Sequence, residues 1–205
     1  MRIAIVGTGN VGSALATAWS KKGHEIYLGV QDTGQFKGKK LLSNPKTTLQ
    51  SVEEAVKKSE VVLLATPAPA AVEVTKSLGD TNGKIILDAM NIVMGKGPAG
   101  FSNTADAILA NTSTKDVIKC FNTTGFNNME NPVYGRESLD MFMAGNNKSA
   151  KEIARQLALD AGFAECYDVG GNDKFTLMES YAFFWINLAM MQGLGREIGF
   201  KLLKR

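Results

Sequence analysis

Three glycines near the start of the chain have the spacing of a loop that binds a diphosphate group. They are Gly7, Gly9 and Gly12, within the run Gly-Thr-Gly-Asn-Val-Gly. In this pattern the first glycine permits a tight turn, the second lets backbone amides approach the diphosphate, and the third lets a helix pack closely on a strand. The free N–H groups and the partial positive charge at the start of that helix attract the anion. The motif therefore predicts binding of a dinucleotide.

The residues at the end of the second expected strand bear on which dinucleotide fits. An acid there would bind the ribose 2′-OH of NAD, and a neutral residue followed by arginine would suit the 2′-phosphate of NADP. Val30 stands at the acid position and Gln31 at the arginine position. Asp32 could take the NAD role from one residue further on, whereas Lys37, the first of three close lysines, could reach a phosphate. We expect NADP, with NAD as the alternative.

Side chains that could move a proton during catalysis are scarce. The single histidine, His24, precedes the second expected strand, so it should lie at the edge of the sheet opposite to bound ligands. No tyrosine is followed by lysine at the fourth residue after it, and Lys174 is the one alternative, which would suit an imine or keto reductase. With one histidine and two cysteines, a Cys/His metal cluster and a disulfide framework are not expected. We expect no dedicated catalytic acid or base and no metal site.

Small and amide side chains follow the later expected strands instead. Thr66 and Pro67 follow one strand, Asn91 follows the next, and Asn122 follows a third. Amides and hydroxyls can orient a nicotinamide, although the two asparagines could also simply form Asx turns that end their strands. A site of this kind suits hydride transfer between two rings, because the rings carry the chemistry and the protein supplies proximity.

Composition excludes other classes of function. There are 23 Lys and Arg against 20 Asp and Glu, a net charge of +3, with no basic block, so nucleic acid is not an expected partner. The longest apolar stretch is shorter than the roughly 20 residues that span a bilayer, and no leader precedes the first strand. We therefore expect a cytoplasmic protein with a small-molecule partner and no membrane attachment.

Strand-like and helix-like segments alternate from residue 2 onward, which predicts an α/β fold with a parallel sheet and right-handed crossovers. The expected strands are 2–6, 25–29, 61–66, 84–89, 116–121, 139–144 and 163–168, and the expected helices are 11–22, 36–42, 52–59, 70–78, 104–110, 148–161 and most of 173–203. Residues 125–137 show no period. The last helix is apolar almost all round near 181–185, which predicts a core helix that could also lie in a dimer interface or roof a substrate pocket.

These motifs together resemble the NADPH-dependent deazaflavin (coenzyme F-420) reductase family, and the reductase domain of six-transmembrane epithelial metalloreductases is a relative. The resemblance extends over nearly the whole chain and includes the glycine-rich loop, Leu-Asp-Ala-Met-Asn at 87–91, Met-Ala-Gly-Asn at 143–146 and the closing run from Gly193 to Leu203. Its most specific part beyond the loop is Lys-Cys-Phe-Asn-Thr at 119–123. Gln31 departs from the arginine that the family has there.

The resemblance implies a Rossmann doubly wound, mainly parallel sheet at 1–122, with a small C-terminal α+β cap containing the long apolar helix at 123–205. It implies a homodimer that moves hydride between NADP(H) and a flavin or deazaflavin. By the same resemblance Thr8, Gly9, Asn10 and Val11 would bind the diphosphate, Val30 and Gln31 would flank the adenosine ribose, and Thr66, Pro67 and Asn91 would contact the nicotinamide side. The residue patterns described above add Gly7 and Gly12 of the loop, Lys37 as a phosphate contact and Asn122 as a further amide to the expected cofactor-binding residues. A non-catalytic NAD(P)-binding sensor is the alternative outside enzymes.

Overall fold

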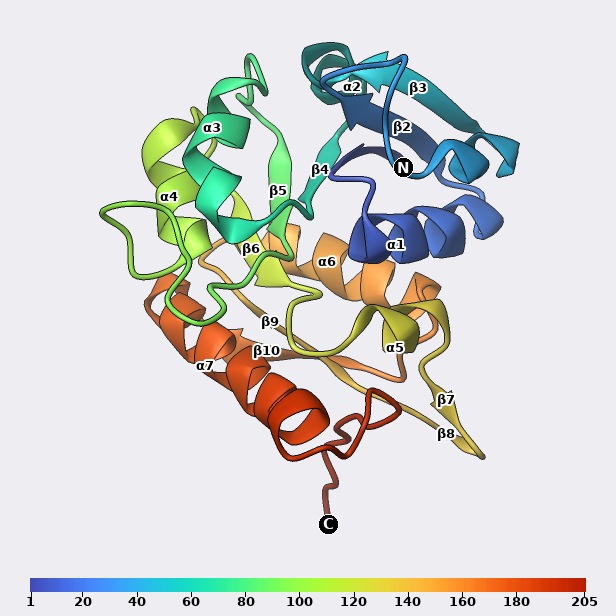
Figure 1. Ribbon diagram of the computed structural model, residues 1–205, viewed down its shortest axis with the longest axis vertical. Helices are drawn as coiled ribbons and strands as arrows, with labels where there is room; N and C mark the ends of the chain where they lie inside the picture. The colour runs from blue at the N-terminus through green and yellow to red at the C-terminus, as the bar shows by residue number, and fades with distance from the viewer.

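The main sheet contains eight strands in the order β10-β9-β6-β5-β4-β1-β2-β3 in the computed structural model, which describes residues 1–205. The strands are β1 Arg2–Val6, β2 Glu25–Val30, β3 Thr47–Ser51, β4 Val61–Leu64, β5 Ile85–Asp88, β6 Val117–Cys120, β9 Met141–Ala144 and β10 Cys166–Gly170. All neighbouring pairs are parallel except β6 and β9, which are antiparallel (Figure 1). The predicted α/β fold with a mainly parallel, Rossmann-type sheet is confirmed.

Helices cover both faces of this sheet. They are α1 Asn10–Lys21, α2 Val52–Lys58, α3 Ala71–Lys76, α4 Thr104–Asn111, α5 Phe126–Glu130, α6 Lys148–Asp160 and α7 Phe175–Ile186. Side chains alternate along β1, so that Ile3 and Ile5 join a core with α1 and α6, whereas Ala4 and Val6 join a second core with α2, α3, α4 and the start of α7. Strands buried on both faces explain the uninterrupted apolar runs in the sequence.

Most expected elements are present, with ends that differ by a few residues. The expected helix at 36–42 is wrong: only a 3-10 turn, Lys39–Ser43, forms there, and it starts after Gly38, which has a positive φ of 89°. Strand β3 is an addition. Its sequence, Thr-Thr-Leu-Gln-Ser, has a single large apolar residue because it is an edge strand with half-buried and exposed side chains, so the apolar pattern did not reveal it.

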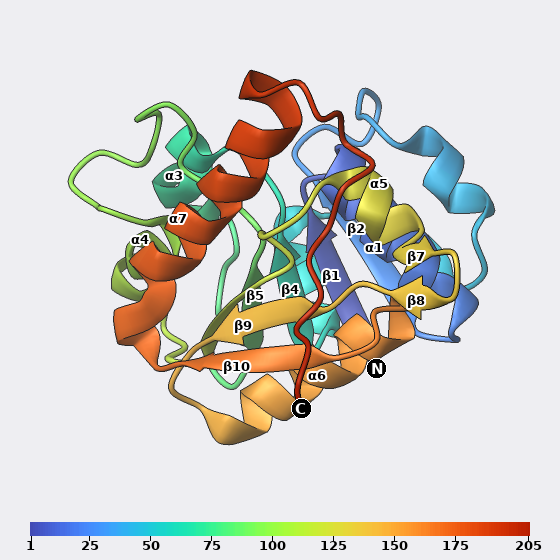
Figure 2. The ribbon, with the colours of Figure 1, turned by 90° about the horizontal axis from the view of Figure 1, so that it is seen from below.

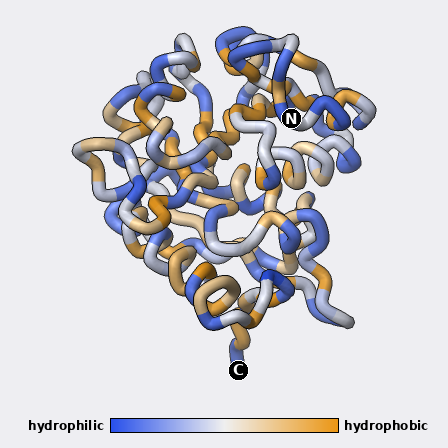
Figure 3. The backbone as a smooth tube through the Cα atoms, viewed as in Figure 1, coloured by the Kyte–Doolittle hydropathy of each residue, from blue (hydrophilic) through white to orange (hydrophobic).

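The last helix is much shorter than expected. Helix α7 continues as a π-helical turn at Asn187–Met191, and residues 192–205 have no regular structure. Gly193 and Gly195, with φ of 74° and 78°, take the left-handed conformation that ends helices. The tail runs back across β9 and β10 to the C-terminus (Figure 2), and most of α7 falls in the hydrophobic range of the hydropathy colouring (Figure 3).

The region without apparent period at 125–137 contains α5 and a short hairpin of β7, Val133–Tyr134, with β8, Glu137–Ser138. Strands β9 and β10 continue the same sheet as β1 to β6. The division of the chain after residue 122 therefore stays a prediction about how the molecule is organised. None of the helices has both the length and the apolar character that a bilayer crossing requires.

Candidate functional site

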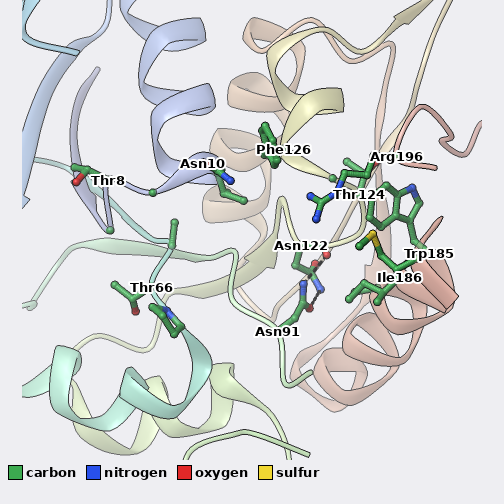
Figure 4. A pocket seen from close by; sticks show the side chains of 18 of the residues that line it. Thr8, Asn10, Thr66, Asn91, Asn122, Thr124, Phe126, Trp185, Ile186 and Arg196 are labelled. Atoms are coloured by element: carbon green, nitrogen blue, oxygen red, sulfur yellow. Dashed lines mark hydrogen bonds between the residues drawn. The ribbon is translucent and has the colours of Figure 1, made fainter. Parts of the chain in front are cut away.

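A cavity of about 700 Å³ opens at the carboxyl ends of the central strands, the edge at which open parallel sheets bind ligands (Figure 4). Most of the predicted cofactor residues line it: Gly7, Thr8, Gly9, Asn10, Val11, Lys37, Thr66, Pro67, Asn91 and Asn122. The remaining lining residues are Ala65, Thr124, Gly125, Phe126, Ala182, Trp185, Ile186, Met190 and Arg196. Lys37 and Arg196 are the only charged side chains among them, so the lining contains two cations and no carboxylate.

The glycine-rich loop forms one wall between β1 and α1. Gly7 has φ of 103°, and a Cβ atom there would lie 2.5 Å from the carbonyl oxygen of Ala65, so only glycine fits. A Cβ atom on Gly12 would lie 1.9 Å from the carbonyl oxygen of Gly7, whereas one on Gly9 would meet nothing within 4 Å. The first and third glycines are therefore needed by the fold itself. Gly9 instead leaves open space at the start of α1, where free N–H groups can receive an anion.

Two asparagines from neighbouring strands form a second wall. The side-chain amide of Asn122 donates to Oδ1 of Asn91 over 2.9 Å, and the amide of Asn91 donates to the carbonyl oxygen of Asn122 over 2.7 Å. Asn122 is almost fully buried, yet its Oδ1 atom has no hydrogen-bond partner. A buried polar atom without a partner is costly, so this oxygen is suited to accept a hydrogen bond from a ligand that carries an N–H group.

A buried ionic cluster holds the loop that carries Asn91. The ammonium group of Lys119 lies 2.9 Å from Oδ2 of Asp88, 2.8 Å from Oε1 of Glu179, 2.6 Å from the hydroxyl of Thr104 and 2.7 Å from the carbonyl oxygen of Met90. Lys119, Asp88 and Thr104 are 0% exposed and Glu179 is 7% exposed. These contacts join the end of β5, the start of α4 and the middle of α7, and so fix three parts of the cavity wall to one another.

Glu179 also receives backbone hydrogen bonds from both neighbouring elements. Its carboxylate accepts from the N–H of Ile92 over 2.9 Å and from the N–H of Thr104 over 2.9 Å. Thr104 begins α4, so the carboxylate satisfies a free N–H group at the positive end of that helix. Met90, the residue before Asn91, donates its N–H to Oδ1 of Asp88 over 2.9 Å. The segment around Asn91 is thus held on both sides.

A second cavity of about 420 Å³ lies on the other side of the glycine-rich loop, next to the end of β2. Val30 and Gln31, the residues predicted to flank the adenosine ribose, line this cavity. Two carboxylates, those of Asp32 and Glu73, line it with them. Asp32 accepts hydrogen bonds from the N–H groups of Gly34 and Gln35, so it caps its own turn. No lysine or arginine lines this second cavity. Lys37 lies in the main cavity instead, where its carbonyl oxygen accepts from the hydroxyl of Thr8.

The third wall of the main cavity comes from α5, α7 and the C-terminal tail. Trp185 and Ile186 project from α7, and Arg196 projects from the tail toward the glycine-rich loop (Figure 4). The tail is tied down because the indole N–H of Trp185 and the side-chain amide of Asn128 both donate to the carbonyl oxygen of Ile198. This wall was not predicted residue by residue, although the apolar stretch at 181–185 suggested a helix that roofs a pocket.

The other side chains considered for chemistry lie away from the cavity. His24 stands at the amino end of β2, where its ring bonds Asp160 over 2.9 Å and the N-terminal amine over 3.2 Å. Lys174 pairs with Asp173 in solvent just before α7 and does not line the cavity. Cys120 and Cys166 are free and buried with their sulfur atoms 3.9 Å apart, and burial raises the pKa of the Cys120 thiol well above its usual value. No group of three or more His, Cys, Asp or Glu side chains could hold a metal ion.

The buried cluster was also missed from the sequence, although a signal was present. Lys119 interrupts the apolar strand β6, Asp88 ends the apolar strand β5, and Glu179 interrupts the apolar helix α7. Charged residues are almost never fully buried unless they are paired. Three charges of mixed sign within apolar elements therefore indicate that these elements meet at one point.

Residues 2–92 match the family model described as NADP oxidoreductase coenzyme F420-dependent. The matched part runs from β1 to the loop after β5 and contains the glycine-rich loop, the second cavity and Asn91. The resemblance drawn from the sequence is therefore confirmed, and the matched part includes residues that line the two cavities.

Other proteins similar to this chain are described as oxidoreductases. Over 95 residues, 41% of this chain, the sequence is 30% identical to a glycerol-3-phosphate dehydrogenase (NAD(P)+) from Thermoanaerobacter sp. (strain X514), of which the match spans only 29%. Among solved structures, a candidate F420-dependent NADP reductase from Arthrobacter sp. fb24 matches with a TM-score of 0.85 and 24% identity over 100% of both chains. A reductive aminase from Aspergillus terreus in complex with NADPH matches with a TM-score of 0.66 and 18% identity over 94% of this chain and 62% of the aminase. The two structural matches establish the fold.

Proposed function

Starting from the similarity of residues 2–92 to the NADP oxidoreductases described as coenzyme F420-dependent, we propose that this protein transfers hydride between NADP(H) and a flavin or deazaflavin acceptor. The observation that carries the proposal is the main cavity. It joins a diphosphate-binding loop to a pair of asparagines and to an apolar wall, and its lining holds no carboxylate, histidine, cysteine or tyrosine. A reaction that depends on bringing two rings together needs no such group.

The residues present fit a dinucleotide. Open space above Gly9 leaves room for a diphosphate beside the first turn of α1, and Lys37 adds a positive charge at this wall. The unpaired Oδ1 atom of Asn122 offers an acceptor for the carboxamide N–H of a nicotinamide. A bound reduced nicotinamide would supply a hydride, and the acceptor would take it together with a proton from solvent.

The protein's contribution in this proposal is orientation and exclusion of water. Asn91 and Asn122 hold each other through two hydrogen bonds, so both amides are fixed before any ligand arrives. Trp185 and Ile186 supply an apolar surface on the opposite wall, against which a flat ring can pack. Holding two reactants in a near-attack arrangement lowers the barrier without a proton-transferring side chain.

NADP(H) is proposed from the family, and the second cavity gives a specific reason to test NAD(H) beside it. Asp32 and Glu73 face the place proposed for the adenosine ribose, and no cation lines it to bind a 2′-phosphate. Titrating the protein with NADPH and NADH in parallel, each followed by intrinsic tryptophan fluorescence, decides between them. Tighter binding of NADPH supports the proposed cofactor. Tighter binding of NADH would instead make NAD(H) the cofactor, with the 2′-OH of its adenosine ribose bound in this acidic cavity.

The enzymatic proposal is tested by an acceptor screen. Oxidation of NADPH is followed by absorbance with flavin mononucleotide (FMN), riboflavin and a deazaflavin supplied in turn. Turnover with at least one of them supports hydride transfer to a flavin-type ring. Tight binding of NADPH without oxidation by any acceptor would contradict it and favour a sensor without turnover.

A second candidate is an imine or keto reductase, which the structural match to a reductive aminase in complex with NADPH favours. In that case Lys174 would have to act as the proton-transferring group. Lys174 lies outside the cavity and forms a solvent-exposed pair with Asp173, so on our proposal Lys174→Ala should leave turnover within about twofold of the wild type. Abolished turnover of Lys174→Ala would instead assign the reaction to the reductase alternative.

We also propose that the protein is a homodimer of the cytoplasm, each chain carrying a dinucleotide-binding part at 1–122 and a cap at 123–205. Large apolar side chains are exposed along one region at the end of the chain, namely Leu177, Phe183, Phe184, Met190, Met191 and Leu194. Exposed apolar patches commonly mark association surfaces. Sedimentation equilibrium should give twice the chain mass, and a mass of 22.0 kDa would contradict the dimer. The buried free thiols accord with a reducing compartment.

A further inference from the structure

Arg196 is a cation in the main cavity that pairs with no carboxylate of the protein. Its side chain is exposed, forms no ion pair, and makes no hydrogen bond from its guanidinium group. The guanidinium carbon lies 5.6 Å from the ring centroid of Phe126, which keeps the group over an aromatic face. With no carboxylate in the lining, nothing in the cavity neutralises this charge.

The backbone of Arg196 is held in place although its side chain is free. Asn127 of α5 donates a side-chain hydrogen bond to the carbonyl oxygen of Arg196 over 2.8 Å and another to Glu197 over 2.9 Å. Two residues on, the carbonyl oxygen of Ile198 accepts from Asn128 over 2.7 Å and from the indole of Trp185 over 2.9 Å. Four side-chain bonds therefore fix the backbone of this part of an otherwise irregular tail, so the Arg196 side chain extends from a fixed point on the wall.

The position of Arg196 distinguishes its role from that of Lys37. Lys37 lies beside Thr8 in the glycine-rich loop, on the wall that suits a diphosphate. Arg196 belongs to the wall of α5, α7 and the tail, next to the apolar surface of Trp185 that suits the acceptor ring (Figure 4). The cavity thus has a cation on each of two walls, and Arg196 is the one beside the surface proposed for the acceptor ring.

We propose that Arg196 binds an anionic group, a phosphate or a carboxylate, that the hydride acceptor carries on its side chain. A planar guanidinium with five N–H donors suits such groups because it can bind two oxygens at once. The inference rests on the proposed function, since it assigns the charge of the acceptor in that same site. It implies that a charged flavin is a better acceptor than its uncharged parent.

FMN and riboflavin test this directly, because they differ by one phosphate. Binding of each is measured by flavin fluorescence in the presence of NADP+, which fills the dinucleotide site without reducing the flavin. We expect the wild-type protein to bind FMN about tenfold more tightly than riboflavin, the lower end of what a hydrogen-bonded charge contributes. Arg196→Gln should lose this preference and keep its affinity for riboflavin within about twofold.

The matched control is Arg136→Gln. Arg136 is an exposed arginine without an ion pair in the turn between β7 and β8, outside the cavity, so this variant removes the same charge from the chain and should keep the preference for FMN. A separate titration of Arg196→Gln with NADPH alone tests whether Arg196 binds a phosphate group of NADPH instead. An NADPH affinity that falls tenfold, with the preference for FMN retained, would assign Arg196 to the dinucleotide and overturn the proposal.

The result separates this inference from the proposed function. Equal binding of FMN and riboflavin by the wild-type protein, or binding of neither, would overturn the role of Arg196. If the protein oxidises NADPH with both flavins equally well, the proposed function stands and only the inference fails. If FMN binds preferentially through Arg196 but accepts no hydride, the anion site stands and the proposed function fails.

Discussion

Replacing Lys119 with methionine should strongly destabilise the protein, because it removes the only cation from a buried cluster that contains two carboxylates. The ammonium group lies 2.9 Å from Asp88 and 2.8 Å from Glu179, and all three side chains are almost inaccessible to solvent. Methionine nearly preserves the length and the apolar part of the lysine side chain. The change therefore reports on charge and hydrogen bonding rather than on a new cavity.

The size of the effect follows from the burial of the pair. Removing one partner of a buried ion pair costs about 3–5 kcal/mol, and a single lysine facing two carboxylates places Lys119→Met in the upper half of that range. A chain of this size loses roughly 2–4 °C of melting temperature per kcal/mol, so we expect a fall of about 8–20 °C. Urea unfolding followed by circular dichroism gives the free energy, and the slope of the transition shows whether unfolding stays two-state.

A control and a double variant make the interpretation specific. Lys151→Met removes a lysine that is 11% exposed but whose partner, Asp168, is 50% exposed and can be rehydrated, so it should cost clearly less than Lys119→Met. Glu179→Gln in the Lys119→Met background should recover part of the loss, because it removes one of the two uncompensated charges. A cost below about 1 kcal/mol for Lys119→Met, or one equal to that of Lys151→Met, would refute the reasoning from buried charge.

Three further predictions concern the cavity and the ionisable groups outside it. Gly9→Val should lower dinucleotide affinity at least about tenfold, because the new side chain would occupy the open space proposed for the diphosphate. The melting temperature should stay near that of the wild type, because nothing lies within 4 Å of a Cβ atom at this position. Unchanged affinity in a nucleotide titration would show that the loop does not bind the dinucleotide. Hydrogen bonds from Arg155 hold the pKa of Glu165 below its usual value, so the stability this group contributes is present above about pH 4.3 and is lost as the pH falls through its folded pKa. Glu165→Gln should accordingly lose less stability in acid, measured by urea unfolding at a series of pH values, and equal acid sensitivity of the two proteins would count against the pair. Burial raises the pKa of Tyr181 to about 12, so the stability that this group contributes is fully present below about pH 10 and falls as the pH rises toward 12. The stability of Tyr181→Phe should therefore be less sensitive to alkali. A spectroscopic phenolate titration in which no tyrosine ionises late would contradict this.

The sequence predicts the sheet and the residues along one half of the main cavity well, because both depend on local patterns. Strand β1 matches its expected range, and Asn91 and Asn122 lie together because the carboxyl ends of neighbouring strands meet. These features need only the apolar runs, the glycine spacing and the parallel order of the strands. The reasoning that places ligands at one edge of the sheet also places His24 at the other, where it is found.

The remaining half of the cavity depends on contacts between distant parts of the chain. Trp185 stands near the end of α7, and Arg196 reaches the site because the chain turns at Gly193 and Gly195 and the tail folds back onto α5. Neither the end of the helix nor the return of the tail has a periodic signal. The partners of Lys119 are separated from it by 31 and 60 residues. A pattern read along the chain can show that a buried lysine needs an acid, but it cannot say which one.

The single antiparallel pair in the sheet also determines which part of α7 lines the main cavity. Because β9 runs opposite to β6, and β10 follows β9, the chain leaves the sheet at Gly170 on the edge remote from the cavity. Helix α7 then runs past β9 before Ala182 and Trp185 reach the lining. At about 1.5 Å per residue, Lys174 is carried roughly 12 Å from Ala182 along the helix axis. The helix acts as a spacer of fixed length, so inserting or deleting a turn would shift the apolar wall by about 5 Å and change the width of the main cavity without altering the glycine-rich loop.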